Sequence, residues 1–168
     1  MPDPSGATLS VANMFAERDA KRRRDLEAEA QLHQKKEEEL QQFKLRLDGF
    51  QLTDDLIQHT LDKIKRAFEH GESELMIASF PSSFCTDYGR AINNAGAQPI
   101  NKRSKEDIAA HPEPEWLATL PVGCMQVYQY WKDHLQPGGF HFVARIISYP
   151  DGKPGDVGLF FSWPRDNE

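Results

Sequence analysis

The chain has 168 residues, a net charge of −6 at neutral pH, 39% hydrophobic residues and 27% charged residues. Its length is typical of one domain with a small appendage. The acidic balance disfavours non-specific nucleic-acid binding, which depends on neutralising phosphates, and no apolar stretch is long enough to predict a membrane-spanning helix. Cys85 and Cys124 fit no metal pattern and are typical of buried thiols, so we expect a cytoplasmic protein.

The N-terminal third of the sequence differs sharply from the rest. We expect residues 1–15 to be disordered or to form a short docking segment. Residues 16–50 are interpreted as a charged helical arm, because Ala16–Asp48 has no Gly or Pro and consists mostly of strong helix formers.

A heptad repeat runs along this arm. The expected interaction seam consists of Leu26, Leu40, Phe43, Leu47 and Phe50. Only its C-terminal part is as apolar as a coiled coil requires. The arm is therefore either a self-associating or partner-contacting helix, or a single helix in solvent.

Residues 51–168 are expected to form a compact α+β domain that opens with a helix over Leu52–Gly71. Thr53 is the expected N-cap and Gly71 the expected C-terminal stop. Apolar side chains recur on one face of this helix, which predicts that it packs on the domain core.

The middle of the domain is predicted to mix one strand with short helices. The strand is at Glu74–Phe80, and its apolar residues on both faces favour a position inside the sheet. A short helix is predicted at Phe84–Asn94 and a long loop at 95–114. One helical turn at Glu115–Leu120 and a longer helix that ends at Leu135 follow.

Alternating side chains predict a β-hairpin formed by Phe140–Tyr149 and Val157–Trp163. We expect all three strands to form one small mixed or antiparallel sheet. The predicted order is α-α-β-α-α-β-β, an α+β fold with helices on at least one face. The face that carries Phe160 has few large side chains, so a partner could lie there, but a helix of this chain, 53–70, is the preferred explanation for its cover.

The strongest candidate for a ligand site is the segment 82–94, because a strand that leads into a helix N-terminus offers free backbone N–H groups. Hydroxyl and guanidinium donors there suit a carboxylate, a phosphate or another small molecule. The candidate residues are Ser82, Ser83, Thr86, Asp87 and Arg90. The competing interpretation is a capped helix with an ordinary Asp87–Arg90 surface contact.

Other residue types that carry chemistry give weaker patterns. Cys85 would be a nucleophile if His134 or His141 acted as its base, but a buried thiol is the preferred interpretation. The six histidines have no metal-binding spacing, so we predict no metal and no cofactor. Acidic neighbours of the Lys21–Arg24 run leave little net positive charge, which disfavours a nucleic-acid partner.

These patterns favour a non-catalytic protein that assembles through its charged arm, either with a second copy or with another protein. The alternative is a small-molecule or anion-binding domain, of which an enzyme is one form. It would use the segment 82–94, with the loop 95–114 as a lid.

Overall fold

The computed structural model describes residues 9–165 and divides the chain into two compact units, residues 1–43 and residues 44–168. Helix α2 (Val11–Asp48) makes up the described part of the first unit and extends into the second. The predicted charged helix is therefore present, and it begins before Ala16. The expectation for residues 1–8 lies outside the described residues.

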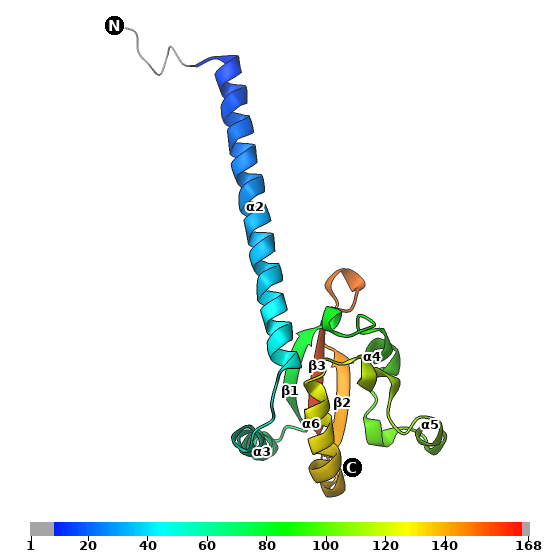
Figure 1. The fold of residues 1–168 in the computed structure, drawn as a ribbon. Coiled ribbons are helices and arrows are strands. Elements are labelled where there is room, and N and C mark those ends of the chain that lie inside the picture. The colour runs from blue at the N-terminus through cyan, green and yellow to red at the C-terminus, as the bar shows by residue number, and fades with distance from the viewer. Residues whose placement is uncertain (1–8, 166–168) are drawn as a thin grey trace. The chain divides into compact units, whose positions relative to one another are not determined.

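The second unit is built on an antiparallel sheet with the strand order β1-β3-β2 (Figure 1). Its strands are β1 (Glu74–Pro81), β2 (His141–Ile146) and β3 (Asp156–Ser162). Strands β2 and β3 pair without a register shift from His141↔Ser162 to Ile146↔Val157. The α+β class and the predicted hairpin are thus confirmed.

Strand β1 lies at an edge of the sheet, so the prediction that it is an interior strand is wrong. Its apolar residues have two different surroundings. Phe80 is buried, and helix α3 (Asp54–Glu69) contacts the strand, whereas Met76 keeps 49% of its surface exposed. A strand supported by a helix beside it can therefore be apolar on both faces without a neighbour on each side.

Helix α3 has the ends that the sequence predicts. At its start, the backbone N–H of Leu56 donates to Thr53 Oγ1 over 3.2 Å. At its end, Gly71 has a φ of +80° and the N–H of Glu72 donates to the carbonyl of Ala67, the pattern of a Schellman motif.

The predicted helix Phe84–Asn94 is wrong. A 3₁₀ turn at Ser82–Phe84 is separated from helix α4 (Arg90–Ala95) by Gly89, whose φ is +80°. An α-helix needs negative φ, so the left-handed Gly89 breaks it and starts α4 in a new direction.

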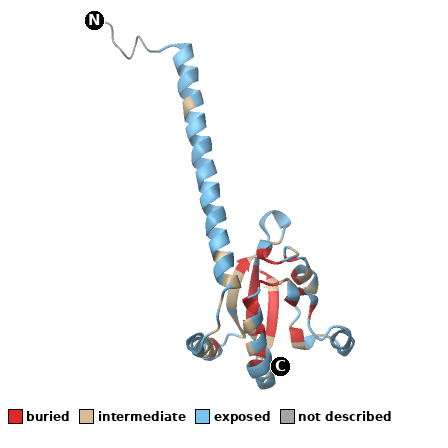
Figure 2. Cartoon of the chain, in the orientation of Figure 1, coloured by how far each residue is buried: buried red, intermediate tan, exposed pale blue. Residues whose placement is uncertain are grey.

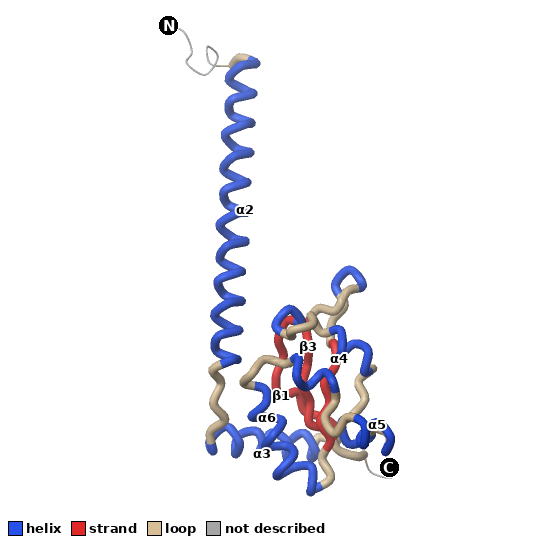
Figure 3. Tube along the Cα trace, turned by 45° about the vertical axis from the view of Figure 1, so that its right-hand side comes forward, coloured by secondary structure: helices blue, strands red, loops and turns tan. Residues whose placement is uncertain are grey.

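The stretch 95–114 also differs from the predicted loop, because it contains two short helical elements (Figure 3). These are a 3₁₀ turn at Ile100–Lys102 and helix α5 (Lys105–Ala110). Ser104 accepts from the N–H of Asp107 and caps α5. The helix has only six residues, fewer than two turns, so its periodic pattern is too short to stand out in the sequence.

The rest of the predicted helices are present. A 3₁₀ helix spans Glu115–Thr119, and α6 (Cys124–Tyr130) continues as a π-helical turn over Trp131–Leu135. Trp131 Nε1 donates to the carbonyl of Phe140, which fixes the turn against the start of the hairpin.

The core lies between the sheet and α6, where the buried residues concentrate (Figure 2). Phe142 is at its centre and is 0% exposed. Its ring contacts four other aromatic rings at centroid distances of 5.7–6.3 Å, namely those of Trp116, Tyr128, Trp131 and Phe161.

The chain between α2 and α3 is held against the start of α6. The side-chain amide of Gln126 donates to the carbonyl of Phe50 and accepts from the N–H of Leu52 over 2.8 Å. The carboxylate of Asp48 accepts from the N–H of Val122 over 3.3 Å. Residues 44–52 therefore belong structurally to the compact domain.

Gly123 is the tightest point of this attachment, and we predict that Gly123→Ala destabilises the second unit. Its φ of −61° suits alanine, but the added Cβ would overlap the carbonyl oxygen of Leu47. Overpacking of this kind costs about 1–3 kcal/mol, measurable by urea unfolding. Gly138→Ala is the control, since its Cβ would meet Phe140 at an ordinary 3.7 Å. Equal stability of the two variants would contradict this packing.

Candidate functional site

Helix α2 is exposed to solvent along almost its whole described length. The helix has 38 residues and none of them is buried. Every residue from Leu9 to Gln42 except Ala20 is exposed, as the colouring of α2 in Figure 2 shows. A helix in a protein normally gains most of its stability by packing one apolar face against other elements. The part of α2 that lies in the first unit buries no such face.

The predicted seam residues fall into two groups. Leu26 and Leu40 are 58% and 44% exposed, while Phe43 is half-buried. Leu47 and Phe50 are also half-buried, and both lie against Gly123 in the compact domain. Among the predicted seam residues, exposure therefore ends after Leu40. The other leucines that α2 exposes, Leu32 and Leu45, are not among the predicted seam residues.

Side chains one helical turn apart pair along the arm itself. His33 Nε2 lies 2.9 Å from Glu37 Oε1, and Gln34 donates to Glu38 over 3.3 Å, both at i,i+4 spacing. Such pairs each add a few tenths of a kcal/mol, about 0.2–0.5 kcal/mol, to an isolated helix. They help to explain how α2 holds its helical form without a packed face.

The candidate ligand segment uses much of its polar capacity internally. Ser82 is buried, and its hydroxyl donates to the carbonyl of Pro154 over 3.1 Å. The carboxylate of Asp87 accepts from the N–H groups of Gly89 and Ala91 at 3.1 and 2.8 Å, so it caps α4. Bonds to the backbone thus occupy two of the five predicted side chains.

The other three residues of that set lie at the surface. Ser83, Thr86 and Arg90 are exposed. The backbone N–H of Thr86 donates to the carbonyl of Thr119 over 2.9 Å, which ties the segment to the neighbouring 3₁₀ helix. The segment is thereby fixed in place by its backbone, with Arg90 directed at solvent from the first turn of α4.

A cleft of about 260 Å³ lies between α4 and the stretch 95–116. Arg103, at its wall, donates to the carbonyls of Ile100, His111 and Pro112 at 3.1, 2.8 and 2.7 Å. These three bonds hold the stretch together around one guanidinium. The predicted lid is therefore a braced segment, and the charge that would attract an anion is already surrounded by backbone oxygens.

Both cysteines are buried free thiols. Burial, and to a smaller extent the negative charge of Asp87, raises the pKa of Cys85 to about 11. Burial raises the pKa of Cys124 to about 12. Of the two proposed bases, His134 is exposed and its ring is tilted by 36° against that of Tyr130, with centroids 4.9 Å apart.

We predict that neither thiol reacts readily in the folded protein at pH 7. With a pKa of about 11 the thiolate fraction of Cys85 is on the order of 10⁻⁴. A thiol-specific chromogenic reagent should report slow modification in buffer and rapid modification of both residues in denaturant. Rapid reaction of one thiol in the native protein would favour Cys85 as a nucleophile.

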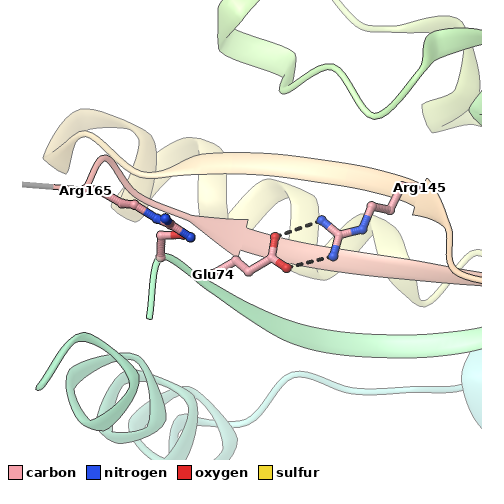
Figure 4. Close-up of polar contacts among 4 residues, drawn as sticks. Glu74, Arg145 and Arg165 are labelled. Carbon is pink, nitrogen blue, oxygen red and sulfur yellow. Dashed lines mark hydrogen bonds and ion pairs between the residues drawn. The ribbon is translucent and has the colours of Figure 1, made fainter. Parts of the chain in front are cut away.

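The outer face of the sheet, opposite the core, carries a polar cluster that sequence analysis missed. The guanidinium of Arg145 on β2 donates two hydrogen bonds, of 2.8 and 2.7 Å, to the carboxylate of Glu74 on β1 (Figure 4). These hydrogen bonds and nearby charge, including that of Arg165, lower the pKa of Glu74. The pair joins the two edge strands across β3.

Arg145 also explains how Phe160 is covered. Its guanidinium lies 3.8 Å from the centroid of the Phe160 ring. A Cβ on Gly158 would come within 2.7 Å of that ring, so the ring lies close over the glycine. The expectation that the helix 53–70 covers this face is wrong. That helix lies on the other side, where Leu56 and Ile57 share a cavity with Val127 of α6.

We predict that Glu74→Gln lowers stability by about 0.5–1 kcal/mol at pH 7 and low salt, a value discounted for solvent screening. Because Arg145 lowers the pKa of Glu74, the contribution is present above the ordinary carboxyl pKa and is lost as the pH falls through the lowered value. The difference in unfolding free energy between wild type and variant, measured in urea, should therefore disappear in acid. Glu72→Gln is the control, and a difference independent of pH would contradict the pairing.

Side-chain clusters that could hold a metal and membrane-spanning helices are both absent from the part of the chain that the structure describes. Between residues 9 and 165, no group of three or more His, Cys, Asp or Glu side chains is placed to hold a metal ion. No helix in the same range is long and apolar enough to cross a membrane. A comparison with known proteins found no matching family model, curated protein or solved structure.

Proposed function

We propose that this is a non-catalytic interaction protein that assembles through α2, by docking the arm on a second copy or on another protein. The observation that carries the proposal is the 38-residue helix without a buried residue, which exposes leucines at seam positions. Apolar side chains at heptad spacing are the standard means by which helices associate.

The arm is favoured over the segment 82–94 for a physical reason. In that segment Ser82 and Asp87 already bond to backbone groups, so they have less capacity left for a ligand. On the arm, the exposed apolar surface has no use within its own unit. We place the assembly in the cytoplasm, where a reducing environment keeps thiols such as those of Cys85 and Cys124 free.

We predict that the double variant Leu26→Lys, Leu40→Lys abolishes assembly. Lysine keeps a high helix propensity but places two charges on the seam. Light scattering on the full chain should give a multiple of 19.2 kDa for wild type and 19.2 kDa for the variant. Circular dichroism would confirm that both remain helical.

Leu45→Lys is the matched control, because Leu45 is 64% exposed on the same helix but lies off the seam. Its mass should follow that of wild type. A wild-type mass of one chain at every concentration would contradict self-association. The partner form would then be tested by comparing proteins captured by wild type and by the double variant.

A further inference from the structure

We infer that the arm pairs with the arm of a second copy of this chain, and that the two helices run antiparallel. This inference rests on the proposed function and adds to it the partner and the direction of pairing. It is carried by the charges that occupy the seam between Asp19 and Phe43, which lies wholly within the first unit.

The seam positions follow from the heptad repeat. One row consists of Asp19, Leu26, His33 and Leu40. The companion row, three residues later in each heptad, consists of Arg22, Glu29, Lys36 and Phe43. All of these except Phe43 are exposed, so a partner helix would meet their side chains directly.

A parallel pair in register would place like charges together. Each seam residue then faces its own counterpart, so Arg22 meets Arg22, Glu29 meets Glu29 and Lys36 meets Lys36. Charges of one sign at a partly dehydrated interface repel strongly. A stagger of one heptad would relieve this repulsion, but the two surfaces would then differ and the pair would not close into a symmetric dimer.

An antiparallel pair centred near Gln31 removes every one of these repulsions. In that register Arg22 faces Leu40, Lys36 faces Leu26 and Asp19 faces Phe43, while Glu29 faces His33. The methylene stems of Arg and Lys can lie along the opposing leucines while their charged ends reach water. The leucines that are 58% and 44% exposed in one copy thereby gain cover.

The residues that flank the seam carry opposite charges across the antiparallel pair on one side and like charges on the other. On the first side Arg23 faces Glu37 of the second copy, and this contact occurs twice by symmetry. On the other side Asp25 faces Glu39, which weakens the pair. Because the attraction and the repulsion partly cancel, the dimer is reversible, and its population depends on protein concentration and on salt.

Thiol cross-linking of the full chain tests the direction of pairing. Arg23→Cys and Glu37→Cys variants are mixed and treated with a short bifunctional maleimide. In the antiparallel dimer these positions are adjacent, whereas in a parallel dimer they are two heptads, about 21 Å, apart. The native thiols do not interfere, because Cys85 and Cys124 are buried.

The matched control is a mixture of Arg24→Cys and Glu38→Cys, the same residue types one position further along. These residues lie at the same level of the dimer but on the outer side of each helix. For the pair 23/37 we expect the main product to be a cross-linked dimer that contains one copy of each variant, identified by its intact mass. For the pair 24/38 we expect no such product.

Three other outcomes would overturn the inference. Self cross-linking of a Leu26→Cys variant, whose seam position meets its own counterpart only in a parallel pair, would show that geometry, and the proposed function would stand. No cross-linking of any variant, with a wild-type dimer that the seam substitutions dissociate, would show another geometry. No cross-linking together with a monomeric wild type would overturn self-association altogether.

Discussion

The packing of aromatic rings around Phe142 is the interaction on which the second unit depends. Phe142 contacts rings from α6, from β3 and from the 3₁₀ helix at Glu115–Thr119, so a single side chain joins elements distant in sequence. Because these elements all converge on one face, the sheet has a covered face and an outer face. The outer face is then covered by its own side chains, with Arg145 lying over Phe160 and paired with Glu74.

The arm lacks any such centre, and its stability has a different origin. Strong helix formers and i,i+4 pairs such as His33–Glu37 favour the helical form locally. At its C-terminal end the chain is anchored where Leu47 and Phe50 pack near Gly123. Between these contributions, the exposed leucines remain as apolar surface without internal use, and this is the physical basis for assigning the arm to assembly.

The sequence predicted those features of the fold that depend only on neighbouring residues. The cap at Thr53, the stop at Gly71 and the alternation of the hairpin each act within a few residues, and the structure has all three. The pair Glu74–Arg145 joins positions 71 residues apart, so no local pattern contains it. Gly89 was visible within the predicted helix, but its positive φ depends on the tertiary position of its neighbours, including Ser82.

The seam shows a further limit of sequence patterns, because one heptad repeat serves two surfaces. Its last members, Leu47 and Phe50, attach the arm to the domain, while Leu26 and Leu40 lie exposed. Apolar spacing alone cannot separate these two uses. The charges at Arg22, Glu29 and Lys36 carry additional information, since they make a parallel, in-register contact costly and an antiparallel one tolerable. In the pairing that we propose, the polar seam positions determine the geometry, and the leucines determine only that pairing is favourable.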